Sequence, residues 1–496
     1  MRRQPQIPVR LALLTQAADR AGSRWPYDPA VNLPATTALI MAAGQGTRMR
    51  SAVPKVLHEV CGRPMIAWPI LAAREAGAGR VSVIISPDHD LSSVLPEGTE
   101  TIVQPVADGT GGALRAALDV VRDSDTVLVL SGDTPLLSAE EIGGLLGAHA
   151  EAGAAATMMT TKLDDPGTFG RVIRAVDGDV QKIVETKKPG DASPEELGVR
   201  EVNAGTYAFS GKALADALDG LTNDNAQGEY YLPDVLPLIR EAGGRVIAHL
   251  VGDPAVNLGV NDRADLARVT AEARRRINLA HMRAGVTIED PGATWIDADV
   301  RIEPDTTILP GTTLRGSTAI ASGSTVGPMA TLIDSRVGER ATVIHSYLTG
   351  CQVGDEARVG PFTYLRPDAH IGDGAKAGTF VEIKNSEIGP GAKVPHLSYI
   401  GDAEVGEGTN LGATTVTANY DGRNKNRTKI GKNVHTGVDT TFVAPVEVGD
   451  DAYTGAGSVI TDDIPPGALG ISRPEQKNVE GYAAKKDKES SEGEDS

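Results

Sequence analysis

A glycine-rich turn followed by two cations is the first segment whose residue types could do chemistry. Residues 42–49 read Ala-Ala-Gly-Gln-Gly-Thr-Arg-Met, and Pro54-Lys55 follows. Glycines let the backbone approach a phosphate closely, and successive N–H groups can then hold it. Arg48 and Lys55 add the fixed positive charge that phosphoryl transfer requires. Such a turn can be purely structural, but its position directly after an apolar run favours nucleotide binding.

An aspartate at the end of another apolar run is a candidate metal ligand. Asp133 follows Ser131 and Gly132, directly after the apolar residues 126–130. Ligands of open α/β sheets bind outside the carboxyl ends of the strands. Mg²⁺ binds few carboxylates and keeps its other contacts for phosphates and water. Asp133 is therefore placed to hold Mg²⁺, although it could also be an ordinary turn residue.

A histidine in the second half of the chain is a candidate general base. His396 lies in residues 393–399, which read Lys-Val-Pro-His-Leu-Ser-Tyr. Taken alone, it is better explained by packing or by a surface position. Arg366, Lys384 and Tyr399 occupy nearby repeat positions, however. Their cations could bind a sugar phosphate while a neutral imidazole accepts a proton.

Strands and helices alternate in the first half of the chain. We expect strands at 37–42, 81–85, 126–130 and 155–160, and helices at 65–76 and 111–121. Ser138, followed three residues later by Glu141, is a capping box that begins another helix. This alternation predicts parallel βαβ units with helices on both faces of a sheet, and Asp177-Gly178 predicts a hairpin. We therefore expect an α/β Rossmann-like nucleotide-binding domain at 36–263.

Aliphatic residues recur with a period of six beyond residue 285. Ile302, Ile308, Leu314 and Ile320 set the period, which later returns with glycine following the aliphatic residue, as in Val353-Gly354. This hexapeptide repeat predicts a left-handed parallel β-helix at 285–475, with three hexapeptides in each of about nine or ten coils. The period is lost between 417 and 430, so the basic segment 419–427 must loop out and indicates an anionic ligand. A helix at 264–284, apolar on one face, links the two domains.

Composition excludes several classes of protein. The 496 residues carry a net charge of −18, which argues against nucleic-acid or anionic-membrane binding. The two cysteines, Cys61 and Cys351, form no disulfide framework or metal pattern, which fits a reducing compartment. No apolar run approaches the roughly 18 residues that span a bilayer. We expect a cytoplasmic enzyme without membrane insertion, preceded by a disordered extension at 1–35 and followed by a disordered tail at 476–496.

The span from about Ala38 to Arg473 resembles the bacterial bifunctional N-acetylglucosamine-1-phosphate uridylyltransferase / glucosamine-1-phosphate N-acetyltransferase family. The matching stretches are 42–49 with 54–55, 109–111, 225–231, 360–362 with 365–367, 380–382, 396–397, 401–404, 419–422 and 471–473. The resemblance implies acetylation of glucosamine 1-phosphate by acetyl-CoA, then transfer of UMP from UTP with Mg²⁺. It also implies a homotrimer with acetylation sites between subunits, acting on small-molecule substrates.

The resemblance also assigns roles to individual residues. UTP and the UDP-sugar would contact Ala42, Ala43, Gly44, Lys55, Gln104, Gly109, Thr110, Gly170, Glu185, Asn203 and Asn261. Of these, Gln104, Gly109 and Thr110 would face the uracil and Gly170, Glu185 and Asn203 the sugar. Asp133 and Asn261 would hold Mg²⁺, and Arg48 and Lys55 would be catalytic. The amino-sugar phosphate would contact Arg366, Lys384, Tyr399, Asn410 and Lys425, with His396 as base and Lys425 from a neighbouring subunit. Acetyl-CoA would contact Ala413, Asn419, Tyr420, Val438, Ala456 and Arg473.

Two departures from the family pattern and two alternatives remain. Ser131 stands where some members have tyrosine, and Val438 where some have a serine that contacts the coenzyme, which puts that contact in doubt. The chain could instead be a single-activity sugar nucleotidyltransferase with a regulatory β-helix, or its β-helix could be a structural trimerisation module. Both alternatives predict that His396, Lys384 and Arg366 are dispensable.

Overall fold

The computed structural model describes residues 35–44, 46–186, 192–224 and 228–486. The chain divides into two compact units, Met1–Arg276 and Ile277–Ser496. The division falls inside helix α8 (Arg263–Arg283), which forms where we expected a helix at 264–284. The extension expected at 1–35 lies, apart from its last residue, outside the described residues.

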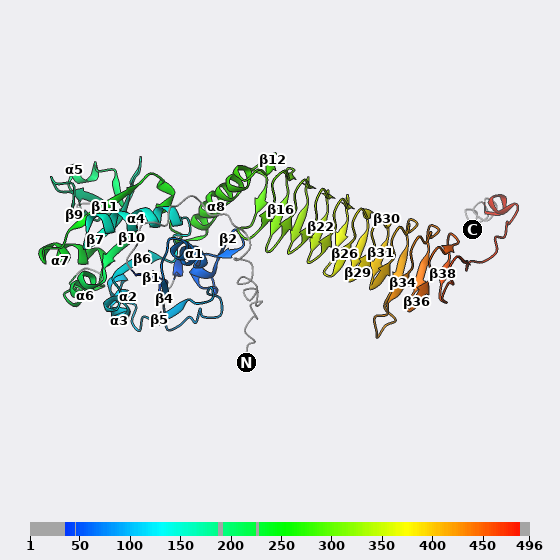
Figure 1. The fold of residues 1–496 in the computed structure, drawn as a ribbon, viewed down its shortest axis with the longest axis horizontal. Coiled ribbons are helices and arrows are strands. Elements are labelled where there is room, and N and C mark those ends of the chain that lie inside the picture. Colours follow the sequence, from blue (N-terminus) through cyan, green and yellow to red (C-terminus); the bar gives the residue numbers. More distant parts are fainter. Residues whose placement is uncertain (1–34, 45, 187–191, 225–227, 487–496) are drawn as a thin grey trace, which may run out of the picture. The chain divides into compact units, whose positions relative to one another are not determined.

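A mixed β-sheet forms the centre of the first unit (Figure 1). Its main strands run in the order β11-β7-β10-β6-β1-β4-β5. Their bounds are β1 (Thr36–Met41), β4 (Arg80–Ile85), β5 (Glu100–Val103), β6 (Thr126–Ser131), β7 (Ala156–Lys162), β10 (Glu201–Ser210) and β11 (Val246–Val251). The pairs β1–β4, β1–β6, β4–β5 and β7–β11 are parallel, which confirms the expected βαβ units. β10, a strand that was not expected, is antiparallel to both β6 and β7. The chain reaches β10 through a hairpin and a four-residue helix, so no long crossover forces a parallel pairing.

The hairpin predicted at Asp177-Gly178 is confirmed. It consists of β8 (Arg171–Arg174) and β9 (Val180–Val184), which pair antiparallel. Gly178 has φ +88°, a left-handed conformation that glycine adopts without strain. β8 also pairs with β10, so the hairpin extends the sheet locally.

Helices cover both faces of this sheet, as predicted. Their bounds are α1 (Ala67–Glu75), α2 (Thr110–Ala116), α3 (Leu118–Arg122), α4 (Ala139–Ala152), α5 (Pro194–Leu197), α6 (Gly211–Asp219) and α7 (Val235–Glu241). Ala38 and Ile40 of β1 pack in one apolar cluster with α1 and α4, whereas Leu39 packs in another with α2, α3, α6 and α7. The single helix expected at 111–121 is instead two, because the backbone leaves the helical conformation at Ala117. The capping box of Ser138 and Glu141 is present at the start of α4.

Short 3-10 helices and strands complete the first unit. The 3-10 helices are η1 (Thr47–Met49), η2 (Lys55–Leu57), η3 (Leu232–Asp234) and η4 (Pro254–Asn257). Strands β2 (Glu59–Val60) and β3 (Arg63–Pro64) pair with each other. Two of these elements, η1 and η2, carry Arg48 and Lys55, the cations predicted to act on a nucleotide.

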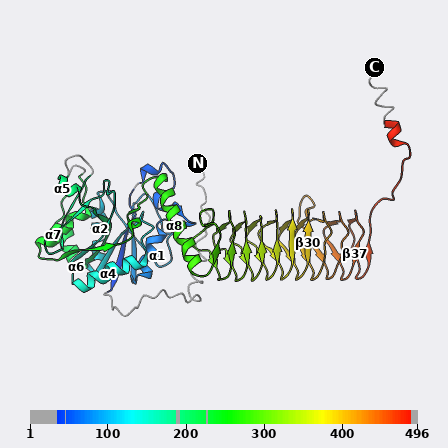
Figure 2. The ribbon, with the colours of Figure 1, turned by 90° about the horizontal axis from the view of Figure 1, so that it is seen from above.

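The second unit is a parallel β-helix, and its successive coils stack along one axis (Figure 2). One wall consists of β12 (Thr287–Ile288), β15 (Thr307–Ile308), β18 (Thr325–Val326), β21 (Thr342–Val343), β24 (Arg358–Val359), β27 (Lys376–Thr379) and β30 (Lys393–His396). A second has β13 (Trp295–Ile296), β16 (Thr313–Arg315), β19 (Thr331–Ile333), β22 (Tyr347–Thr349), β25 (Tyr364–Leu365), β28 (Glu382–Lys384), β31 (Tyr399–Gly401), β33 (Val416–Ala418), β35 (Thr441–Val443) and β38 (Val459–Ile460).

The third wall closes the prism. It has β14 (Arg301–Ile302), β17 (Ala319–Ile320), β20 (Arg336–Val337), β23 (Gln352–Val353), β26 (Ala369–Ile371), β29 (Ser386–Ile388), β32 (Ala403–Val405), β34 (Thr428–Ile430) and β36 (Val446–Val448). A short pair, β37 (Tyr453–Thr454) and β39 (Leu469–Gly470), follows. The second wall contains ten strands within the described residues, which agrees with the predicted nine or ten coils.

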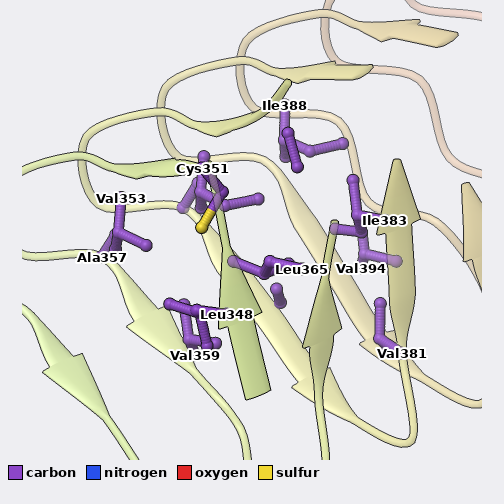
Figure 3. Close-up of a cluster of buried hydrophobic side chains, with 14 of the residues drawn as sticks. Leu348, Cys351, Val353, Ala357, Val359, Leu365, Val381, Ile383, Ile388 and Val394 are labelled. Carbon is purple, nitrogen blue, oxygen red and sulfur yellow. The ribbon is translucent and has the colours of Figure 1, made fainter. Parts of the chain in front are cut away.

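The residues of the six-residue period fill the interior of the β-helix. Ile308, Leu314 and Val326 are fully buried, and the column continues through Leu348, Leu365 and Ile383 (Figure 3). Because each coil supplies one such residue to each wall, a narrow prism obtains a continuous core from small aliphatic side chains.

Two segments of the second unit lie outside the repeat. The loop between β33 and β34, at 419–427, projects from the coils as predicted (Figure 1). The tail expected to be without structure at 476–496 contains a helical turn at 482–486, where Lys485 N–H donates to Gly481 C=O. The side chains of this turn are exposed, and residues 487–496 lie outside the described residues.

Candidate active sites

The glycine-rich turn and Asp133 meet at one edge of the first unit's sheet. β1 and β6 are parallel neighbours with Met41 opposite Ser131, so the segments that follow them emerge side by side. The N–H of Gly132 donates to the carbonyl oxygen of Met41 over 2.9 Å, which joins the two segments directly. Gly46 has φ +61°, and a Cβ there would lie 2.6 Å from Cβ of Lys55. Glycine at this position therefore lets Lys55 approach the turn.

Lys55 and Asp133 form an ion pair at this edge. Lys55 Nζ lies 2.5 Å from Asp133 Oδ2, and the two side chains are only 15% and 22% exposed. Ser131 Oγ donates to the other carboxylate oxygen, Oδ1, over 2.6 Å. Ser131, noted as a departure from the family pattern, thus orients the Asp133 carboxylate in this chain.

Asn261 and Arg48 complete the cluster. Val260 N–H donates to the carbonyl oxygen of Asp133 over 3.0 Å, which brings Asn261 beside it. Arg48 Nη2 donates to Asn261 Oδ1 over 2.9 Å. The four side chains of Arg48, Lys55, Asp133 and Asn261 carry two positive charges, one negative charge and one amide. The net positive charge suits a polyphosphate.

The oxygen donors of this cluster also fit Mg²⁺. Asp133 offers a carboxylate and Asn261 an amide oxygen, and Mg²⁺ is commonly held by one or two protein oxygens with phosphates and water completing the octahedron. Within the described ranges, no group of three His, Cys, Asp or Glu side chains is arranged to hold a metal. A divalent ion at this edge would therefore take its remaining ligands from the phosphates of the nucleotide and from water.

The residues predicted to recognise the base lie together after β5. Gln104 is 5% exposed, and its Nε2 donates to Asp108 Oδ1 over 2.9 Å and to Gly109 C=O over 3.2 Å. Gly109 has φ +102°, and a Cβ there would lie 2.5 Å from the carbonyl oxygen of Tyr230. Thr110 Oγ1 accepts from Leu232 N–H over 2.9 Å. This network fixes the Gln104 amide side chain and leaves the backbone at Gly109 without a side chain beside it.

The residues predicted to recognise the sugar come from the β8–β9 hairpin and from β10. Gly170 C=O accepts from Asn203 N–H over 3.1 Å, and a Cβ on Gly170 would lie 3.5 Å from Glu185 Oε1. Asn203 Oδ1 accepts from Gly205 N–H over 2.9 Å, and Asn203 Nδ2 donates to Tyr207 Oη over 2.6 Å. The Asn203 side chain is thus locked before any ligand arrives.

The cations of the second unit align on adjacent coils. Arg366 N–H donates to Ile383 C=O over 2.9 Å, so Arg366 and Lys384 occupy the same position of successive coils. Arg366 Nη1 lies 2.9 Å from Glu382 Oε1, and Glu382 is the register partner of Tyr399 in the next coil. His396 is the last residue of β30, and a two-residue turn separates it from Tyr399, the first residue of β31. The His396 side chain is exposed. Three of the predicted phosphate-contacting residues therefore share one wall beside an accessible imidazole.

Lys425 lies against its own chain. Its side chain is beside that of Lys384, and this second ammonium group lowers the pKa of Lys425. Two adjacent ammonium groups repel each other, so an anion between them would be attracted strongly. The family resemblance implies that Lys425 acts on a neighbouring subunit, whereas in the single chain its loop lies against its own wall. The assignment of Lys425 to a neighbouring subunit stays a prediction.

Asp402 is a site residue to which sequence reasoning assigned no role. It is 4% exposed, it accepts from Asn385 Nδ2 over 2.5 Å, and it also accepts from Asn419 Nδ2. Burial by itself raises the pKa of Asp402, but these hydrogen bonds and the nearby Lys384 and Lys425 hold the pKa below its usual value. The only sequence signal for Asp402 was an acidic residue that directly follows the glycine of a repeat. The same Gly-Asp pair occurs in several other repeats, so it could not identify Asp402 as a site residue.

The residues predicted to contact acetyl-CoA are arranged along later coils. Asp439 N–H donates to Ala413 C=O over 2.8 Å, and Gly457 N–H donates to Val438 C=O over 2.9 Å, so Ala413, Val438 and Ala456 lie near one corner. Arg473 Nη1 donates to Ala456 C=O over 3.0 Å. Val438 and Tyr420 are more than half exposed, whereas Asn419 is buried beside Asp402.

Asn410 is set apart from the other phosphate candidates. Its backbone pairs in parallel with Lys393 of β30 on one side and with His435 on the other. Asn410 therefore belongs to the wall that contains β30. Among the contacts recorded for the described residues, none joins Asn410 to Arg366 or Lys384. Its predicted role therefore depends on a ligand that spans two walls.

Comparisons with known proteins agree with this arrangement. Residues 38–232 match the MobA-like NTP transferase domain, and residues 427–462 match the bacterial transferase hexapeptide family. Curated proteins called bifunctional protein GlmU from Mycobacterium tuberculosis and Mycobacterium bovis are 46% identical to this chain over 461 residues, covering 91% of it and 92% of each relative. The Mycobacterium marinum protein of that name is 47% identical, covering 91% and 93%. No helix in the described part of the chain is long and apolar enough to cross a membrane. The chain therefore belongs to the GlmU family of bifunctional uridylyltransferase/acetyltransferase enzymes.

Proposed function

We propose that the chain makes UDP-N-acetylglucosamine in two steps at two sites. In the second unit, glucosamine 1-phosphate is acetylated by acetyl-CoA. In the first unit, the resulting N-acetylglucosamine 1-phosphate receives UMP from UTP, and pyrophosphate leaves. The observation that carries the proposal is the convergence of Arg48, Lys55, Asp133 and Asn261 at one sheet edge.

Uridylyl transfer needs positioning and charge rather than a covalent intermediate. A phosphate oxygen of the sugar phosphate attacks the α-phosphorus of UTP, and the bond to pyrophosphate breaks. Arg48 and Lys55 neutralise charge that builds up on the phosphoryl oxygens. Asp133 and Asn261 would hold Mg²⁺, which supplies Lewis-acid stabilisation of the triphosphate when bound. Gln104, Gly109 and Thr110 orient the uracil, and Gly170, Glu185 and Asn203 the sugar.

Acetyl transfer needs a base and an anion-binding surface. The amine of glucosamine 1-phosphate is nucleophilic only when neutral, so His396 accepts its proton as nitrogen attacks the thioester carbonyl. The C–S bond then breaks, and coenzyme A leaves as the free thiol after it receives a proton. Arg366, Lys384, Tyr399 and Asn410 hold the sugar phosphate. Acetyl-CoA lies along Ala413, Asn419, Tyr420, Ala456 and Arg473. Val438 stands where some relatives have a serine, and its side chain has no hydroxyl to offer the coenzyme.

Reciprocal loss of the two activities tests this assignment. His396→Ala should lower acetyl transfer by about 10²–10⁴-fold, the usual contribution of a positioned general base, and leave uridylyl transfer unchanged. Release of free thiol from acetyl-CoA measures the first activity and pyrophosphate release the second. If His396→Ala acetylates at the normal rate, a purely structural or regulatory β-helix becomes the better account.

We also propose a cyclic homotrimer in which subunits share the acetylation site. An exposed row of side chains on the second unit supports association; we call Met329, His345, Phe362, Phe380 and Leu397 the corner ridge. Its four non-histidine members are 52–60% exposed, and the Phe362 and Phe380 rings stack with centroids 5.2 Å apart. A contiguous exposed apolar row on a folded protein commonly marks an interface. The corner ridge ends at Leu397, next to His396.

Mixed oligomers test the sharing of sites. His396→Ala and Lys425→Ala chains carrying different affinity tags are co-expressed, and doubly tagged oligomers are isolated. If Lys425 acts on a neighbour, about a quarter of the sites should regain both groups in a symmetric ring. If Lys425 instead completes the acetylation site of its own chain, beside Lys384, the mixture shows only the sum of the parental activities. Phe380→Glu should disrupt the oligomer in size-exclusion chromatography with light scattering, whereas the exposed Val176→Glu should not.

A further inference from the structure

The β8–β9 hairpin carries two of the three sugar residues but has little backbone pairing with the sheet. Gly170 precedes β8 and Glu185 follows β9, whereas Asn203 lies on β10. β8 and β10 share a single register pair, Arg171 with Val202. Gly170 is also joined to Asn203 by a backbone hydrogen bond, from Asn203 N–H to Gly170 C=O over 3.1 Å. At the other end of the hairpin, Glu185 follows β9, which pairs with β8 and not with β10 among the described strands, so its position depends on side chains that tie β8 to β10.

A side-chain cluster between β8, β10 and β7 supplies this tie. Arg174 Nε donates to Glu201 Oε2 over 2.9 Å, and Arg174 Nη2 donates to Glu201 Oε1 over 2.5 Å, a bidentate pair. Thr160 Oγ1 donates to Glu201 Oε1 over 2.6 Å. We call Arg174, Glu201 and Thr160 the hairpin clamp. A bidentate arginine–carboxylate pair fixes orientation as well as distance.

Burial makes the hairpin clamp stronger than an ordinary surface pair. The Glu201 side chain is 10% exposed and that of Arg174 33% exposed. Burial by itself raises the pKa of Glu201, but the hydrogen bonds from Arg174 and Thr160 hold the pKa below its usual value. Arg174 Nη1 also donates to Gly178 C=O over 2.9 Å, so the same guanidinium holds the turn of the hairpin.

We propose that Arg174 and Glu201 are positioning residues for the sugar-phosphate substrate of uridylyl transfer. Through the hairpin clamp they set the distance of Glu185 from Asn203, and so determine affinity for the sugar phosphate rather than for the nucleotide. This inference rests on the sugar-binding role proposed above. Gln104, Gly109 and Thr110 are attached to β5, and β6, β1 and β4 separate β5 from β10 in the sheet. Loosening the hairpin clamp should therefore leave recognition of the base intact.

Steady-state kinetics of Glu201→Gln in the full-length enzyme test the inference. The KM for N-acetylglucosamine 1-phosphate should rise by about tenfold, since a loosened subsite loses ground-state contacts. The KM for UTP, the kcat and the rate of acetyl transfer should stay within about twofold. Asp179→Asn is the matched control, because Asp179 forms a bidentate pair with Arg245 (3.0 and 3.1 Å), which joins the same hairpin to the start of β11 and not to β10, the strand that carries Asn203. This control should leave all four quantities unchanged.

A double-mutant cycle separates positioning from general destabilisation. Arg174→Gln should raise the same KM, and the Arg174→Gln/Glu201→Gln double variant should be no worse than either single variant, because both act through one pair. If Glu201→Gln does not fold, Arg174→Lys, which keeps the charge but loses the bidentate geometry, takes its place. Equal rises in both KM values, additive effects in the cycle, or no change in the KM for the sugar phosphate would each overturn the inference.

A reference variant distinguishes failure of this inference from failure of the proposed function. Asn203→Ala removes a predicted sugar contact directly. If Asn203→Ala leaves the KM for N-acetylglucosamine 1-phosphate unchanged, the sugar subsite itself is misplaced. If Asn203→Ala raises that KM and Glu201→Gln does not, the subsite stands and the hairpin clamp has no positioning role.

Discussion

Phe442 has the largest fully buried side chain among the described residues of the β-helix core. It is fully buried, and its register partners are Thr417 in the preceding coil and Ile460 in the next. Thr417 is also fully buried, and its hydroxyl is committed to Gly401, accepting from the N–H over 2.8 Å and donating to the C=O over 3.0 Å. A large ring therefore compensates for a small polar residue in the column of aliphatic side chains.

Phe442→Ala should be costly because the cavity cannot collapse. The coils on both sides are held at a fixed spacing by parallel backbone hydrogen bonds, so neighbouring side chains cannot move in to fill the space. Buried Phe→Ala changes destabilise by about 3–5 kcal/mol. We expect at least the middle of this range, about 4 kcal/mol, which corresponds to roughly a 10³-fold increase in the local opening equilibrium. In a solenoid each coil contacts only its neighbours, so the loss falls on the C-terminal coils.

Hydrogen exchange followed by mass spectrometry measures this local opening. Amides of β33, β35 and β38 should lose protection, acetyl transfer should fall with them, and uridylyl transfer should persist. Leu332→Ala is the matched control, since Leu332 is fully buried on the same wall many coils away. It should loosen its own coils and spare those that carry Ala413 and Val438. Uniform loss of protection along the whole second unit in Phe442→Ala would refute the reasoning.

Three further outcomes are expected. Asp133→Asn should abolish Mg²⁺-dependent pyrophosphate release and spare thiol release, and EDTA should act in the same way; loss of both activities in a folded variant would count against separate sites. Gly109→Ala should raise the KM for UTP by at least about tenfold, because its Cβ meets Tyr230 C=O at 2.5 Å and its φ is +102°, and an unchanged KM would remove Gly109 from base recognition. Asp402, whose pKa is lowered in the folded chain, contributes stability that is present above its unfolded pKa of about 3.9 and lost as pH falls through the folded value. Urea denaturation of Asp402→Asn against the wild type should therefore show a stability difference at neutral pH that shrinks below about pH 4, whereas a constant difference would exclude linkage.

Periodicity predicted the β-helix because the repeat leaves little choice. One aliphatic residue in six has to point inward, and the buried column from Ile308 to Ile383 follows that rule. The capping box at Ser138 and the hairpin at Gly178 were equally predictable, because each depends on residues within three or four positions. The antiparallel β10 was missed, since strand direction depends on how the chain returns to the sheet and not on local propensity.

The candidate sites were predictable as residues but not as contacts. Sequence order places Lys55 and Asp133 far apart, and only the parallel pairing of β1 with β6 brings their segments together. The hairpin clamp was not predicted at all, because Arg174 and Glu201 have no spacing that marks them as partners. The position of Lys425 beside its own Lys384 depends on the loop's path, which no repeat specifies.

One reaction mixture tests the central claim that a single chain performs both steps. The purified protein is incubated with glucosamine 1-phosphate, acetyl-CoA, UTP and Mg²⁺, and free thiol, pyrophosphate and nucleotide sugar are quantified together. We expect UDP-N-acetylglucosamine to form with one thiol and one pyrophosphate per molecule. Omission of acetyl-CoA should abolish it, and N-acetylglucosamine 1-phosphate should restore it. Pyrophosphate release without thiol release in the complete mixture, or a UDP-sugar formed from glucosamine 1-phosphate without acetyl-CoA, would contradict the account.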